Sequence, residues 1–157
     1  MKTLSSICLV MVLALALAAC GGGNDGNASS SSSNGGGGSS SASDPDFSTP
    51  KATMTELAAG FAASDIEKIL ACYDKEYLDA KRDDGKTNAE KLRAEMKELS
   101  DEGSKITIKF EDADISVEGD KAKVKATMTF TMKDGKTEEE GEGFELVKKG
   151  DTWKCVK

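Results

Sequence analysis

The chain has 157 residues, 28 of them acidic and 21 basic, and it contains no histidine. Its acidic balance argues against nucleic acid as a partner and against electrostatic docking on anionic lipid. The lack of histidine removes Ser-His-Asp and Cys-His catalysis, together with the commonest metal ligand. No P-loop or dinucleotide-binding glycine pattern is present, so we expect no cofactor and no metal.

The first twenty residues have the layout of an export signal. Lys2 supplies a positive start, and small residues after a short apolar run lead into Cys20. The apolar run, Ile7 to Ala16, is shorter than the about 20 residues of a comfortable membrane span. The segment Leu17-Ala18-Ala19-Cys20 resembles a bacterial lipobox. This resemblance implies removal of residues 1–19 and lipidation of Cys20 with fatty acyl chains such as palmitate; the alternative is an ordinary secretory peptide with a chance cysteine.

The next segment, residues 20–48, consists almost entirely of glycine, serine and asparagine. Such a composition cannot bury enough apolar surface to fold. We expect a flexible tether with an r.m.s. span of roughly 25–30 Å, which holds a folded domain away from the membrane. The absence of Asp at Gly21, by analogy with lipoprotein sorting rules, favours the outer membrane of the cell envelope if the organism has one.

Residues 49–157 are one domain's worth of chain, and their first half predicts three helices. The first helix begins at Thr49-Pro50, an N-cap followed by proline. The second begins at a capping box, Ser64 to Glu67, and carries one apolar stripe as far as Tyr77. The third begins at another capping box, Thr87 to Glu90, and ends near a glycine at position 103.

From Lys105 onward the apolar period changes to two, which predicts about four antiparallel strands. The first strand changes parity near Glu111-Asp112, where we expect a bulge or bend. The clearest strand then alternates over residues 121–132, and Asp134-Gly135 after it is a hairpin signal. Strands that follow helices indicate an α+β domain with the helices on one face of the sheet.

Two stretches of this domain resemble nuclear transport factor 2-like (SnoaL-like, cystatin-like) domains. Residues 63–70, which open the second helix, are similar to their start, and residues 144–154 are similar to their closing hairpin, in which a polar turn precedes a Trp-Lys pair. The likeness covers most of residues 50–157 and is nearest to bacterial envelope lipoproteins that carry a domain of unknown function. It implies a cone-shaped fold, a curved sheet around a helix, that can hold a small ligand. The missing histidine puts in doubt the Asp-His pairs of several enzymes in this superfamily.

Candidate pocket residues lie on the second helix and on the clearest strand. In a cone-shaped fold Tyr73 and Tyr77 can line a pocket and hydrogen-bond a ligand, although tyrosines on such a stripe also fit a core. Met128 and Phe130 can line an apolar cavity or belong to the core.

Two cysteines of the domain, Cys72 and Cys155, form an even pair for an oxidising compartment. They can form a disulfide or remain two partly buried thiols. Only their geometry decides between these alternatives.

The acidic stretch after Asp134-Gly135 allows two registers. A two-residue turn places Glu139 inward beside Phe130 and requires one extra residue near Gly141-Gly143 to return the strand to its apolar face. A three-residue turn requires no bulge, but it turns three glutamates inward: Glu138, Glu140 and Glu142. Burial of unpaired carboxylates costs several kcal/mol each, so we favour the bulged register.

These features support two functions. The domain binds a small apolar or amphipathic molecule, or an envelope partner, without catalysis. Alternatively, it is a small enzyme of the isomerase or hydratase kind that uses an inward carboxylate, such as Glu139, with Tyr73 or Tyr77. The enzyme hypothesis requires the carboxylate and a tyrosine on the same face. We favour the binding function and leave open whether the protein is an enzyme.

Overall fold

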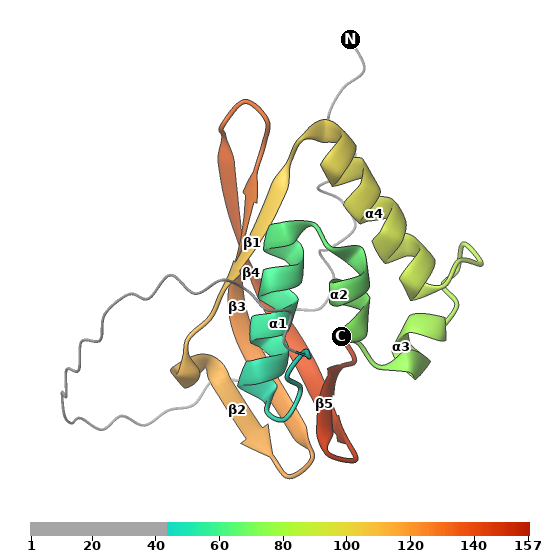
Figure 1. The fold of residues 1–157 in the computed structure, drawn as a ribbon, viewed down its shortest axis with the longest axis vertical. Coiled ribbons are helices and arrows are strands. Elements are labelled where there is room, and N and C mark those ends of the chain that lie inside the picture. The colour runs from blue at the N-terminus through green and yellow to red at the C-terminus, as the bar shows by residue number, and fades with distance from the viewer. Residues whose placement is uncertain (1–43) are drawn as a thin grey trace, which may run out of the picture. The chain divides into compact units, whose positions relative to one another are not determined.

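The computed structural model describes residues 44–157, in which four helices accompany an antiparallel sheet (Figure 1). The helices are α1 (Pro50–Ala63), α2 (Ile66–Ala71), α3 (Lys75–Asp79) and α4 (Asn88–Glu102). The strands are β1 (Lys105–Lys109), β2 (Ile115–Glu118), β3 (Lys121–Thr131), β4 (Thr137–Lys149) and β5 (Thr152–Cys155), with a short 3₁₀ helix, η1 (Asp112–Asp114), before β2. The predicted α+β class is confirmed. The predicted signal peptide, the lipidation of Cys20 and the tether as far as residue 43 lie outside the described residues.

Most helix ends follow from local capping. The side chain of Thr49 accepts a hydrogen bond from the backbone nitrogen of Ala52, with Pro50 in the first turn, as expected. Thr87 and Glu90 form the predicted capping box at the start of α4. The capping box predicted at Ser64 is wrong, because Ser64 ends α1 in the left-handed conformation (φ 53°) and the next residue caps α2 instead.

The predicted second helix is divided in two. Between α2 and α3 the backbone leaves the helix at Cys72–Asp74 and pairs with β5. The backbone nitrogen of Cys155 donates to the carbonyl of Cys72 at 2.9 Å, and that of Asp74 donates to the carbonyl of Cys155 at 2.8 Å. Because these bonds come from a strand more than eighty residues away, the local apolar stripe did not reveal the break.

The sheet has the order β1-β3-β4-β5, and β2 pairs with the same edge of β3 as β1 does. Lys109 of β1 lies opposite Thr127, whereas Ile115 of β2 lies opposite Val124. The residues between β1 and β2 include η1. Even-numbered residues of β1 and odd-numbered residues of β2 therefore lie opposite even-numbered residues of β3. The expected parity change near Glu111-Asp112 is therefore confirmed.

One face of the sheet, which we call the covered face, packs on the helices and holds the core. It carries Ala122, Val124 and Ala126 of β3 with Phe144 and Leu146 of β4, all buried. Figure 1 shows α1 lying across this sheet. The buried side chains Met54, Leu57 and Phe61 of α1 belong to the same core cluster.

The beginning and the end of the domain are joined directly. The hydroxyl of Thr53 donates to the carbonyl of Trp153 at 3.1 Å in a buried position. The backbone nitrogen of Trp153 in turn donates to the carbonyl of Phe47 at 2.8 Å. These bonds hold β5 against the segment that enters α1.

The register of β3 and β4 corrects the favoured expectation. Three residues, Lys133 to Gly135, form the turn, and the pairing runs without a bulge from Thr131–Thr137 to Lys121–Val147. A two-residue turn of the common hairpin type requires positive φ at both central residues. In this turn only Gly135 has a positive φ (83°). The side chain of Asp134 accepts a hydrogen bond from the backbone nitrogen of Lys136 across the same turn.

This register moves the glutamates of β4. Glu138, Glu140 and Glu142 lie on the covered face, opposite Phe130, Met128 and Ala126. Glu138 and Glu140 remain exposed and Glu142 is half-buried, so the expected burial cost does not arise. Glu139 lies on the outer face opposite Thr129, whose hydroxyl is 3.5 Å from its carboxylate. The prediction that Glu139 points inward is therefore wrong.

Candidate functional site

The predicted site residues Tyr73 and Tyr77 lie side by side, Tyr73 in the break between α2 and α3 and Tyr77 in α3. Their rings are stacked, with centroids 5.4 Å apart and planes inclined by 17°. Tyr73 is positioned by its bridge to Cys155 of β5, and Tyr77 by the short helix α3. The side chain of Asp74 caps α3 by accepting from the backbone nitrogen of Glu76 at 2.9 Å. The pair is thus held by secondary structure on both sides.

Both phenols are partly shielded from water. Burial raises the pKa of Tyr73 well above its usual range, and the thiol of Cys155 and the neighbouring phenol raise it further. Burial also raises the pKa of Tyr77, an effect that nearby Arg82 opposes. Both rings therefore stay protonated at neutral pH and can act as hydrogen-bond donors. Neither hydroxyl bonds to another of the described residues.

Charged side chains of both signs act on this pair. Glu142 lies on the covered face of β4, and its charge makes the smallest contribution to the raised pKa of Tyr73. The charge of Glu95 in α4 likewise raises the pKa of Tyr77, against the larger opposing effect of Arg82. Tyr73 and Tyr77 therefore form the candidate site, with Glu142 on the covered face of the sheet. Sequence reasoning placed Glu142 inward only in the register that it did not favour, because the direction of this side chain depended on the turn at residues 133–135.

The other predicted pocket residues lie on the covered face of β3. Met128 and Phe130 are half-buried and pack against the core cluster. They share this face with Glu138 and Glu140, so an apolar surface here is bordered by carboxylates. Of the predicted pocket set, only Glu139 falls on the opposite face of the sheet.

The two cysteines are neighbours in the core. Both side chains have no exposed surface, and both are free thiols in this structure. Cys72 donates its thiol proton to the carbonyl of Lys68 at 3.3 Å. Burial raises the pKa of each thiol to about 12. Of the two alternatives for this pair, the structure contains the buried thiols.

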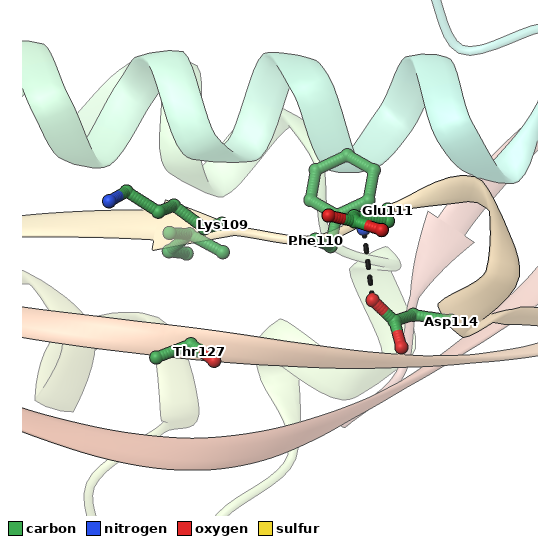
Figure 2. Close-up of a pocket in the computed structure, with 6 residues that line it drawn as sticks. Lys109, Phe110, Glu111, Asp114 and Thr127 are labelled. Atoms are coloured by element: carbon green, nitrogen blue, oxygen red, sulfur yellow. Dashed lines mark hydrogen bonds between the residues drawn. The ribbon is translucent and has the colours of Figure 1, made fainter.

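A separate open pocket of about 560 Å³ lies where β1 and β2 part on the edge of β3. Figure 2 shows Lys109, Phe110, Glu111, Asp114 and Thr127 around it. The carboxylate of Asp114 already accepts a hydrogen bond from the backbone nitrogen of Glu111 at 3.0 Å. This pocket follows from the bend at η1, and its polar groups do not converge on one point.

No group of three or more Cys, Asp or Glu side chains in residues 44–157 is arranged to hold a metal ion. Among the helices of the same range, none combines the length and the apolar character required to cross a bilayer.

Comparison with known proteins gives a likeness of fold. No protein-family model and no curated protein sequence matches the chain. A domain classified as a calcium/calmodulin-dependent protein kinase type II association domain, from Thiobacillus denitrificans, matches with TM-score 0.53 and 16% identity over 72% of this chain and 94% of its own. A SEC-C motif-containing protein from Rhodopseudomonas palustris matches with TM-score 0.53 and 20% identity over 70% and 77%.

A third structure, classified as an aromatic ring hydroxylase from Novosphingobium aromaticivorans, matches with TM-score 0.51 and 18% identity over 68% of this chain and 80% of its own. The three proteins are described in different terms. At these identities the likeness shows the shared α+β fold alone, and function has to be argued from the site.

Proposed function

We propose that this chain is a lipid-anchored cell-envelope protein whose nuclear transport factor 2-like domain binds a small amphipathic molecule, or an envelope partner, without catalysis. The stacked pair of Tyr73 and Tyr77 carries the binding part of the proposal. The lipobox-like segment ending at Cys20 carries the anchoring part. Attachment through acyl chains would place the domain at the membrane surface, on the outer membrane if the cell has one.

The chemistry of the site favours a particular kind of ligand. Aromatic faces attract flat apolar groups and cations, and partly buried phenols donate hydrogen bonds. The carboxylates of Glu142, Glu140 and Glu138 on the same face oppose an anionic ligand. A flat or elongated apolar molecule with a cationic group therefore fits these residues best.

The enzyme alternative loses its first candidate carboxylate, because Glu139 lies on the outer face of the sheet beside Thr129. Glu142 is an inward carboxylate that remains, but among the described residues no hydrogen bond joins it to Tyr73 or Tyr77. A general base has to reach the proton that it removes within hydrogen-bond distance. Binding is therefore the better supported function.

A cationic dye tests the binding site. A fluorescent alkylpyridinium dye is titrated into the purified full-length chain and into Tyr77→Ala and Glu142→Gln variants. We expect several-fold weaker binding by both variants, because one removes a ring and the other removes the nearby charge. Glu139→Gln is the matched control, since it removes the same charge on the opposite face. Equal dye affinity for all four proteins would contradict the proposal.

Labelling in cells tests the anchor. Cells expressing the chain are supplied with an alkyne-tagged fatty acid, and the protein is fractionated with the membranes. We expect label and membrane association for the unchanged chain and for Cys8→Ser, whose altered residue lies in the segment that is removed. Cys20→Ser should lose both. A labelled Cys20→Ser protein, or an unlabelled unchanged chain, would contradict lipidation at Cys20.

A further inference from the structure

The outer edge of β4 has a long unpaired section. Strand β5 pairs with β4 only over Leu146–Lys149, and Glu145 bonds to the chain just after β5. Within residues 44–157, no other backbone pairs with this edge over residues 137–144. In Figure 1 the hairpin of β3 and β4 accordingly extends well past the end of β5. We call residues 137–144 the open edge.

The direction of its backbone groups follows from the pairing. The backbone nitrogen of Glu145 donates to Lys157 and its carbonyl accepts from Val156, so both groups point away from β3. Backbone groups in an antiparallel strand alternate between the two sides. The same outward direction therefore applies to four residues of the open edge: Thr137, Glu139, Gly141 and Gly143. Each presents a donor and an acceptor without a partner in the described chain.

Two of these outward positions are glycines that the described chain does not require. Gly141 and Gly143 have no positive φ, and the pairing around them contains no bulge. A Cβ on either would meet no atom within 4 Å. Glycine inside a strand otherwise marks a place where another backbone or a ligand approaches closely. The unpaired edge and the two bare positions thus point to the same event, the addition of a strand.

We propose that the open edge binds an extended, lysine- or arginine-rich peptide segment as an additional strand. The open edge carries carboxylates on both faces, Glu139 on the outer face and Glu138, Glu140 and Glu142 on the covered face. Opposite charges on neighbouring strands stabilise their pairing. Backbone hydrogen bonds to the edge supply affinity in this mode of recognition, and alternate side chains supply specificity.

The same charges disfavour a second copy of this chain as the added strand. When two open edges pair antiparallel over Glu138–Glu142, glutamates on one strand face glutamates on the other. Like charges directly opposite one another are destabilising. Charged edges also protect natural proteins from edge-to-edge aggregation.

A lysine-threonine repeat peptide tests the proposal on the purified full-length chain. The fluorescent ten-residue peptide is compared with a glutamate-threonine peptide and with a lysine-threonine peptide N-methylated at every residue, so that neither of its edges can donate. We expect binding of the unmodified lysine peptide alone, because N-methylation keeps the charge and removes the hydrogen bonds. Equal binding of the N-methylated peptide would overturn the proposal, since it would show charge attraction without strand addition.

Backbone variants locate the site. Gly141→Pro removes an outward N–H without removing a hydrogen bond to β3, and Gly141→Ala is the matched control that keeps it. We expect peptide affinity to fall about tenfold or more in the proline variant, as for a lost hydrogen bond at a closed interface, and to fall less in the alanine variant, which keeps the N–H but adds a Cβ at the edge.

Amide hydrogen exchange of the unchanged chain provides a readout that does not depend on the folding of a variant. The amides of Glu139, Gly141 and Gly143 should exchange quickly in the free protein and slowly in the presence of saturating lysine-threonine peptide. Peptide binding without this protection would place the peptide elsewhere and overturn the proposal. The dye titration reports on the tyrosine site, and amide exchange reports on the open edge. The proposed ligand site and the proposed peptide site can therefore fail separately.

Discussion

Gly60 of α1 lies directly against Ile69 of α2. A Cβ on Gly60 would be 2.9 Å from Cγ1 of Ile69 and 3.1 Å from its backbone nitrogen. Ile69 has no exposed surface, so it has little room to move. The absence of a side chain at position 60 therefore sets how closely the first two helices approach.

Gly60→Ala should destabilise the domain in spite of the higher helix propensity of alanine. Overpacking of this kind costs about 1–3 kcal/mol, which exceeds the propensity gain. Urea unfolding followed by circular dichroism measures the change. Gly141→Ala is the matched control, because a Cβ there meets open space. An unfolding free energy of Gly60→Ala equal to that of the unchanged chain would contradict the close packing.

The two core thiols should react slowly with a thiol reagent while the domain is folded. Cys72 and Cys155 have no exposed surface, and burial raises their pKa to about 12, so little thiolate exists at pH 8. The measurement uses a Cys8→Ser, Cys20→Ser background with Ellman's reagent in buffer and in urea. Two thiols should appear only in urea. No thiol in urea without reductant would show that the pair is oxidised.

The same thiols should make the domain less stable in alkali. Their pKa rises from 9.0 to about 12 on folding, so the unfolded chain releases protons first as the pH increases above 9. The free energy of unfolding should therefore fall between pH 9 and 12, and the buried phenol of Tyr73 acts in the same direction. Cys155→Ala should give a shallower fall, measured by urea unfolding at several pH values. An identical slope in the variant would exclude this thiol as a cause.

The capping box of α4 should contribute measurably to stability. The hydroxyl of Thr87 accepts from the backbone nitrogen of Glu90 at 3.2 Å, and the carboxylate of Glu90 accepts from that of Thr87 at 2.8 Å. Thr87→Ala should cost about 1 kcal/mol in urea unfolding, as for other N-caps. Thr107→Ala is the matched control, because Thr107 lies on the outer face of β1 and caps no helix.

The capping box should also respond to acid. Hydrogen bonds from Thr87 lower the pKa of Glu90 below its usual 4.5. A carboxylate with a lowered pKa stabilises the folded state above its unfolded value and loses this contribution as the pH falls through its folded value. The cost of Thr87→Ala should therefore shrink below pH 4. An equal cost at pH 3 and pH 7 would show that the hydroxyl of Thr87 does not stabilise the ionised carboxylate of Glu90.

Local signals accounted for what could be predicted. The caps at Thr49 and Thr87, the alternation of β3 and the parity change before Ile115 all depend on residues close together in the chain. Each of these features is specified by neighbouring residues, and the α+β class follows from the order of the helices and strands along the chain. None of them required knowledge of a distant partner.

The predictions that were wrong concerned features that depend on contacts between distant residues or on a small energy difference between two registers. The break between α2 and α3 is made by backbone bonds from Cys155, which a local stripe cannot show. The inward carboxylate was assigned to Glu139 because burial of three glutamates was expected to be costly. The covered face is open near Glu138 and Glu140, so that cost is absent and the conformation of one turn decided the register.

Trp153 accepts a hydrogen bond from Thr53 and donates one to Phe47, and these bonds have a consequence for the order of folding. The first helix, which is synthesised early, obtains these partners only after residue 153 has left the ribosome. Contacts between such distant parts of a chain form late and slow its folding. A nascent chain therefore cannot form these two bonds, or the pairing of β5 with β4, before its final strand has been made.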